Sequence, residues 1–131
     1  MSARTLDDMA TSTGVTVLEH LDRQTSIPLL SGLQFQGDVA IVPTTGKRAK
    51  TPVIAAGVAV VRGESGGNTH EIQADGQVFC DTRTATGTDL VLAVLTVDSG
   101  EAVLCHPEHG FNRIAPGSYE LRRQREMADE I

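Results

Sequence analysis

The chain has 131 residues and a formal net charge of −6 at pH 7, with 40% hydrophobic but only 3% aromatic residues. This length suits one domain, whose core must be built mainly from Val, Ala, Ile and Leu. The negative charge argues against a nucleic-acid or membrane partner, because both present negative charge to the protein. The sequence has no apolar run near about 18 residues and no signal-peptide pattern, so we expect a cytoplasmic or virion protein.

The N-terminal thirty residues show no sustained apolar period. We predict that residues 1–30 form an N-terminal arm. Its first 14 residues are expected to be flexible, or to form a short helix that only a partner orders. Residues 15–21 fit either a strand or one helical turn. The β-domain is predicted to span residues 31–131.

From residue 31 onwards, short apolar segments alternate with turn residues. The segments predicted as strands lie at residues 39–43, 53–61, 69–72, 77–80, 90–97, 102–106 and 118–123. Residues 53–61 are the most apolar and are predicted as a central strand. Asp75-Gly76 is predicted as a two-residue hairpin turn, and Asp98-Ser99-Gly100 as another turn.

Short strands with turn signals at intervals of about 8–12 residues indicate an all-β domain, an antiparallel β-sandwich or a small barrel. Only residues 122–131 look helical, so a short C-terminal helix is expected. Cys80 and Cys105 lie among strand-forming residues and are predicted to be reduced and buried, because two cysteines form no disulfide framework.

Gly63-Glu64-Ser65-Gly66-Gly67 matches the G-x-S-x-G pattern of serine hydrolases. In those enzymes a helix follows the serine directly and helps to form the oxyanion hole. Residues 66–69 are poor helix formers, and the residues after them alternate like a strand. We therefore interpret the stretch as a glycine-rich turn between two strands.

Three of the four histidines lie at predicted turns or strand ends. In His106-Pro107-Glu108-His109, proline at the second position favours a four-residue turn whose ends approach within about 7 Å. His70 arrives from another strand. Three imidazoles with an open fourth position suit zinc or iron, with Glu64 or Glu108 as the candidate base. The spacing leaves open the alternative that these histidines are solvated or structural.

Three stretches together resemble a known family. Gln36-Gly37-Asp38-Val39 resembles Q-G-D-V, residues 63–70 resemble G-E-x-x-G-H-x-H, and residues 106–126 resemble H-x-E-H followed by P-G-x-Y-x-x-x-R-Q-R-E. The combination is similar to an uncharacterised family of small proteins from bacteria, plasmids and phages. The resemblance implies that His70 and the His106/His109 turn belong to one signature. Asn68 stands where the pattern has the first histidine of H-x-H.

The spacing also has a faint likeness to cupins, which are small β-barrels with a G-x(n)-H-x-H motif and a later P-x-G turn. This likeness implies a jelly-roll or cupin-like variant of the all-β fold. Tyr119 stands where a cupin would place its last histidine.

Two functional hypotheses follow. The first is a non-catalytic binding or assembly protein of phage or mobile-element type, either an accessory or a virion structural protein. It would act through protein partners, as a homo-oligomer or in a larger assembly, and would need no cofactor. The alternative is a metal-dependent cupin-like enzyme or metal-binding protein, with His70, His106 and His109 binding zinc or iron. We favour the first because few side chains look catalytic, and we leave open whether the protein is an enzyme.

Overall fold

A computed structural model describes residues 4–15, 26–61, 69–82 and 91–123. One helix and ten strands lie within these ranges, in the order β1 (Arg4–Thr5), α1 (Leu6–Thr13), β2 (Ser26–Ile27), β3 (Leu29–Leu30), β4 (Gln34–Gln36), β5 (Val39–Pro43), β6 (Val58–Val61), β7 (His70–Thr82), β8 (Val91–His106), β9 (Gly110–Ile114) and β10 (Gly117–Arg123). The helix within these ranges is not long and apolar enough to span a membrane.

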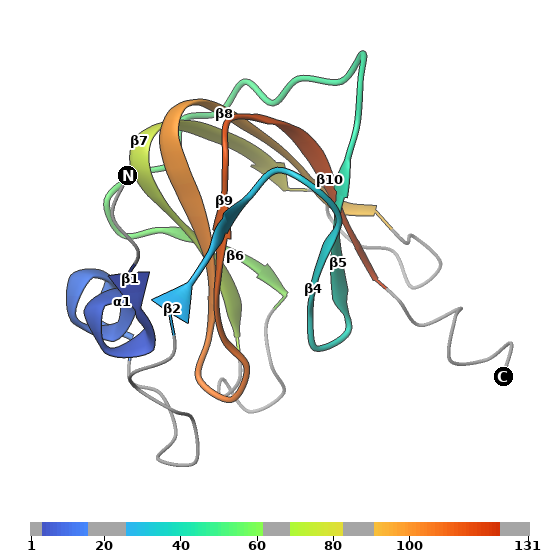
Figure 1. Ribbon diagram of the computed structural model, residues 1–131. Helices are drawn as coiled ribbons and strands as arrows, with labels where there is room; N and C mark the ends of the chain where they lie inside the picture. Colours follow the sequence, from blue (N-terminus) through green and yellow to red (C-terminus); the bar gives the residue numbers. More distant parts are fainter. Residues whose placement is uncertain (1–3, 16–25, 62–68, 83–90, 124–131) are drawn as a thin grey trace, which may run out of the picture.

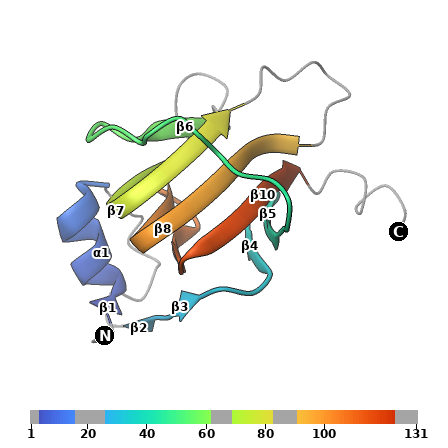
Figure 2. The same ribbon diagram turned by 90° about the horizontal axis from the view of Figure 1, so that it is seen from above.

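The strands form a nearly closed barrel organised around β8, which confirms the all-β prediction (Figure 1). One side of β8 pairs with β7, and the other side pairs first with β10 and then with β9. Seen from above, β7, β8 and β10 run side by side, and β6 lies at the outer edge of β7 (Figure 2). Most pairs are antiparallel, and β3 pairs with β9 in parallel.

Side-chain amides connect β4, at one end of the strand path β3-β9-β8-β10-β5-β4, to β9 near its other end. Asn112 on β9 donates a hydrogen bond from Nδ2 to the Gln34 side chain and another to the Phe35 carbonyl, both at 3.1 Å. Gln34 in turn donates to the Arg113 carbonyl at 3.2 Å. Buried amides of this kind need partners, and here each strand supplies the partners of the other.

The barrel interior is aliphatic, as the scarcity of aromatic residues predicts. Its fully buried side chains include Val39, Ile41, Ile72, Leu95, Leu104, Ile114 and Leu121. Each such side chain contributes about 1.5–3 kcal/mol relative to an exposed one. Tyr119 is the buried aromatic residue in this cluster, and its hydroxyl donates to the Ala115 carbonyl at 2.7 Å.

The N-terminal arm is not a flexible tail in the part that the structure describes. Leu6–Thr13 forms α1, and its start is fixed by a capping box between Thr5 and Asp8. Leu6 and Met9 are buried in a second core cluster that also contains Phe111 on β9. The helix is therefore ordered by the chain's own barrel, and the prediction that it needs a partner is wrong. Most of residues 15–21, for which the sequence allows a strand or one helical turn, lie outside the described residues.

Both turns predicted in the middle of the chain are wrong, because β7 and β8 run through them without interruption. Asp75 pairs with Glu101, and Gly76 pairs with Gly100. A Cβ on Gly76 would lie 2.3 Å from the Ser99 carbonyl oxygen, and one on Gly100 would lie 2.0 Å from that of Asp75. The glycines therefore mark a point where two long strands bend together with their backbones in close approach, as glycines inside strands commonly do.

Two further element predictions need correction. Only residues 58–61 of the predicted strand 53–61 form β6, which pairs with β7 alone among the described strands, so it is not central. Residues 54–57 turn instead, with the Gly57 N–H donating to the Ile54 carbonyl. At the C-terminal end, Arg122 and Arg123 belong to β10, so no helix starts at Arg122. The rest of the predicted C-terminal helix lies outside the described residues.

Candidate functional site

Three histidine rings lie together at one end of the barrel. His70 begins β7, His106 ends β8, and His109 lies in the turn between β8 and β9. The register places Glu71 opposite Cys105, which brings His70 and His106 to the same end of the paired strands. The ring centroids are 4.3 Å apart for His70 and His106, 4.5 Å for His106 and His109, and 6.2 Å for His70 and His109. We call these three residues the histidine cluster.

His106 stabilises the turn that carries His109. Its Nδ1 accepts hydrogen bonds from the backbone N–H groups of Glu108, at 3.0 Å, and of His109, at 3.3 Å. A neutral imidazole has one N–H and one lone pair, so the proton of His106 must be on Nε2. In this arrangement neither nitrogen of His106 offers a lone pair to a metal ion.

Gln36 fixes the opposite tautomer in His70. The Gln36 Nε2 donates to the Leu104 carbonyl at 2.8 Å and to the Gly110 carbonyl at 3.2 Å. These acceptors set the orientation of the amide, so its Oε1 faces His70 Nδ1 at 2.9 Å. His70 Nδ1 therefore carries the proton, and the lone pair lies on Nε2. Asp38 Oδ1 is 3.5 Å from that nitrogen.

His70 is buried, with 4% of its surface exposed. Burial lowers the pKa of His70 to about 4, and the neighbouring His106 contributes to the decrease, while Asp38 opposes it. The ring is therefore neutral near pH 7. Asp38 forms an ion pair with this ring only when the ring is protonated.

His109 packs against the β4–β5 turn. Gly37 has φ of +57°, and a Cβ there would lie 2.8 Å from His109 Nε2. Glycine at this position thus provides both the turn conformation and the space for the ring. His70, at the start of β7, and His109, in the turn between β8 and β9, therefore contact the same short turn, Gln36-Gly37-Asp38.

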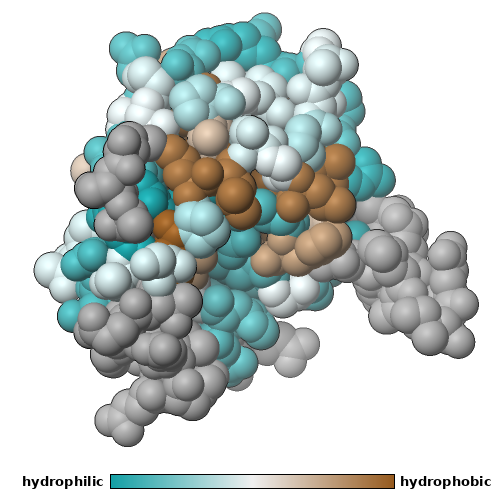
Figure 3. Space-filling model, viewed as in Figure 1, coloured by the Kyte–Doolittle hydropathy of each residue, from teal (hydrophilic) through white to brown (hydrophobic). Residues whose placement is uncertain are grey.

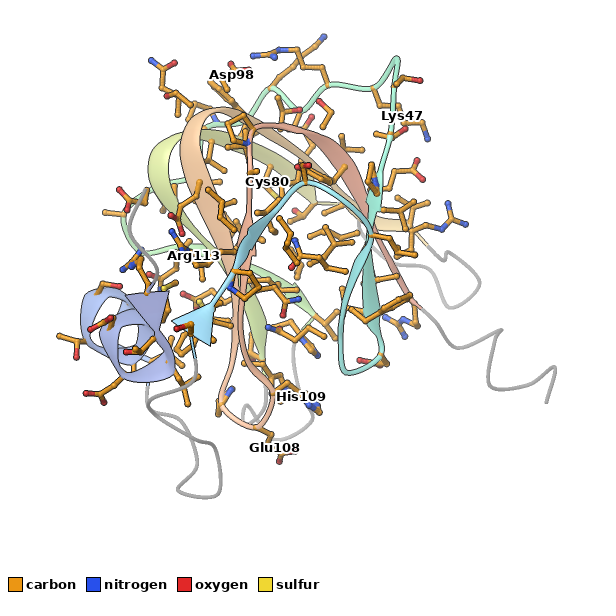
Figure 4. All side chains as sticks on the ribbon, in the orientation of Figure 1. Lys47, Cys80, Asp98, Glu108, His109 and Arg113 are labelled. Atoms are coloured by element: carbon orange, nitrogen blue, oxygen red, sulfur yellow. The ribbon has the colours of Figure 1, made fainter. Side chains whose placement is uncertain are left out.

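The metal role predicted for the histidine cluster remains a prediction. Within the described ranges, no group of three or more His, Cys, Asp or Glu side chains is arranged to hold a metal ion. Of the two candidate bases, Glu108 lies at the tip of the β8–β9 hairpin, beside His109 (Figure 4). Glu64 lies outside the described residues, as does Ser65 of the glycine-rich turn.

Both cysteines are free and buried, as predicted. Burial raises the pKa of the Cys80 thiol to about 12 and that of the Cys105 thiol to about 12. Because the thiolate is the reactive form, neither side chain is an activated nucleophile. Cys105 contributes instead to the second core cluster beneath α1.

A family model described as a domain of unknown function (DUF8820) matches residues 35–124. The chain belongs to the DUF8820 family. The DUF8820 match includes Gln36, Asp38 and all three members of the histidine cluster, so the cluster and the turn it contacts lie inside the family domain. It confirms the predicted membership of an uncharacterised family. No curated protein and no solved structure shows a significant match to this chain.

Sequence reasoning did not identify Gln36, Asp38 and Asn112 as parts of this site. Gln36 and Asp38 stand in the Q-G-D-V motif, which by itself indicates no contact with a histidine. A usable signal was present in Gln34-Phe35-Gln36, where two amides alternate with an apolar residue. In a strand this pattern points both amides to one face.

Proposed function

We propose that this protein is a non-catalytic binding or assembly protein, of the accessory or virion structural type found in phages and mobile elements. We propose further that its partner is a second copy of the same chain. The observation that carries this proposal is an exposed apolar strip, which we define as Leu30, Leu33 and Phe35. These side chains are 41%, 56% and 49% exposed, respectively. Apolar surface lies over the segment that joins β3 to β4 (Figure 3).

The charge distribution favours self-association through this strip. Charged residues make up 21% of the chain and give it a net charge of −6, so two copies repel each other on average. Residues 26–36, which contain the strip, carry no charged residue at all. A contact between two copies therefore avoids like-charge repulsion if it is centred on this segment.

The apolar strip also lies on the two strands that end the main strand path. Leu30 belongs to β3 and Phe35 to β4, and these two strands terminate the main strand path. Edge strands and exposed apolar side chains are the features that associating proteins commonly use. In a two-fold symmetric dimer the same strip from each copy would face the other, which requires no second specialised surface.

The chemistry of the described side chains supports a role without catalysis. The two thiols have a pKa near 12 because of burial. In the histidine cluster, His106 uses its Nδ1 to hold a turn. His70 uses its Nδ1 to bind Gln36. Both contacts hold the local conformation of the chain, which is a structural role.

The proposal is tested by sedimentation velocity of the purified chain and of two strip variants, Leu33→Asp and Phe35→Asp. We expect the natural chain to sediment as a defined oligomer and each variant to shift to monomer with an unchanged circular dichroism spectrum. Ile54→Asp is the matched control, because Ile54 is apolar and 65% exposed but lies outside the strip. A monomeric natural chain, or an oligomer that only Ile54→Asp disrupts, would contradict the proposal.

A further inference from the structure

A pocket lies where the N-terminal arm meets the β7–β8 sheet, at the place where α1 lies beside β7 (Figure 2). Its lining includes Arg4 and the end of α1 on one side, and Gln73, Asp75 and Val103 on the other. Its volume is about 260 Å³. At about 30 Å³ per water molecule, it has room for roughly nine waters or for one small organic molecule. None of the residues that line it belongs to the histidine cluster or to the apolar strip.

The strand register brings the side chains of the barrel wall together. Gln73 pairs with Val103, and Asp75 pairs with Glu101, so these four side chains lie on one face of the sheet. This is the face that α1 covers, because Val103 belongs to the second core cluster. Arg4 extends over the same face, where its Nη1 is 3.6 Å from Glu101 Oε2 and 3.8 Å from Asp75 Oδ2. The pocket therefore has one wall from the arm and one from the barrel.

Polar groups on both walls keep hydrogen-bonding capacity that the described residues do not use. Arg4 donates one hydrogen bond, from Nη2 to a hydroxyl of α1. Its carboxylate neighbours lie beyond hydrogen-bond distance, so its other N–H groups remain available. The Gln73 Nε2 donates to the Thr13 carbonyl at 3.1 Å and to Glu71 Oε1 at 2.9 Å. These bonds fix the amide and leave its Oε1 as an acceptor. Asp75, whose side chain is 74% exposed, is a second acceptor.

The charges around the pocket favour a neutral zwitterion as its ligand. Three carboxylates and two guanidinium groups surround it, namely those of Glu71, Asp75 and Glu101 and those of Arg4 and Arg113. One negative charge is therefore in excess, and a free anion is repelled both by it and by the net charge of −6. A zwitterion matches both signs. Its charged groups also form hydrogen bonds about twice as strong as those of a neutral polyol.

We propose that this pocket binds a small zwitterion of the α-amino-acid class. The carboxylate of the ligand accepts hydrogen bonds from Arg4, and its ammonium group donates to Asp75 and to Gln73 Oε1. Arg4 belongs to the arm, whereas Gln73 and Asp75 belong to β7, so the ligand connects the arm to the barrel. This binding function goes beyond the proposed self-association, which uses a different surface.

Equilibrium dialysis of the full-length chain against radiolabelled L-serine and, separately, L-glutamine tests the proposal. We expect saturable binding of at least one of them at one site per chain, and at least about tenfold weaker binding in Asp75→Asn and in Arg4→Gln. Excess acetate, methylammonium or glycerol should not displace the label, because each presents only part of the zwitterion. Asp38→Asn is the matched control, because Asp38 is also an exposed carboxylate but does not line the pocket. Circular dichroism of each variant confirms that it is folded.

Three outcomes would overturn the proposal. In the first, the natural chain binds neither amino acid. In the second, Asp75→Asn binds as tightly as the natural chain. In the third, acetate or glycerol displaces the label as well as the unlabelled amino acid does, which would show that the zwitterion is not recognised as such. Leu33→Asp, which disrupts the apolar strip, should bind the amino acid like the natural chain, so a failure of the pocket and a failure of self-association are distinguishable.

Discussion

Replacing Gln36 with leucine tests how the candidate site is held together. Gln36 is 2% exposed, and its side-chain nitrogen donates to two backbone carbonyls and to Asn112 Oδ1. Its oxygen accepts from His70. The amide nitrogen has two N–H groups, shared among three acceptors, so about three bonds of about 1 kcal/mol net each are lost, or about 3 kcal/mol in all. The apolar surface that leucine buries offsets about 1–2 kcal/mol. We therefore expect Gln36→Leu to lower the free energy of unfolding by about 1–2 kcal/mol.

Urea denaturation at pH 7 in the presence of a chelator measures this loss as a change in midpoint at constant m-value. Gln77→Leu is the matched control: Gln77 is an exposed residue of β7, where the same substitution should change stability by no more than about 0.5 kcal/mol. If Gln36→Leu cost no more than Gln77→Leu, the amide network would not be what connects β4 to β8 and β9. The orientation assigned to His70 would then lose its physical basis.

Three further predictions concern pH, a buried ion pair and the thiols. His70 has a pKa of about 4 in the folded chain and 6.5 as an ordinary value, so the unfolded chain binds more protons between these limits. Stability of the metal-free protein should therefore fall by about 2 kcal/mol as the pH drops from 6.5 to 4, and His70→Gln should flatten this dependence in urea titrations. Glu101 accepts two hydrogen bonds from Arg113, at 2.7 and 2.8 Å, in a buried ion pair. Glu101→Gln should therefore lower the free energy of unfolding by about 3 kcal/mol. Asp98→Asn, at the exposed pair with Arg48, is the control and should leave the urea midpoint nearly unchanged. Cys80 and Cys105 should resist a thiol-specific alkylating reagent, monitored by mass spectrometry, until denaturant is added; rapid modification of the native chain would contradict their burial.

The strands could be predicted from the sequence because alternation and apolar runs are local signals. The bend that β7 and β8 share could not be predicted from such local signals. Asp75-Gly76 and Ser99-Gly100 each carry the residues of a turn, but their backbones approach each other so closely that they form one shared bend. Only the pairing of the two strands decides between a turn and a bend, and that pairing is not visible in either segment alone.

Of the candidate site, the sequence predicted only the part that local spacing reveals. The H-x-x-H spacing contains the local turn, so His106 and His109 could be identified as neighbours. Gln36 reaches Leu104 and Gly110, which follow it by 68 and 74 residues. No spacing rule connects residues that far apart. Which ring nitrogen carries a proton likewise depends on these distant partners, and it decides which histidine can bind a metal.

The most direct test of this account is a long-range ¹H–¹⁵N spectrum of the histidine rings at pH 7 in the presence of a chelator. Two adjacent rings in opposite tautomers are predicted, His70 with its proton on Nδ1 and His106 with its proton on Nε2. His70 protonated on Nε2, or on both nitrogens, would contradict the hydrogen-bond arrangement described for the histidine cluster.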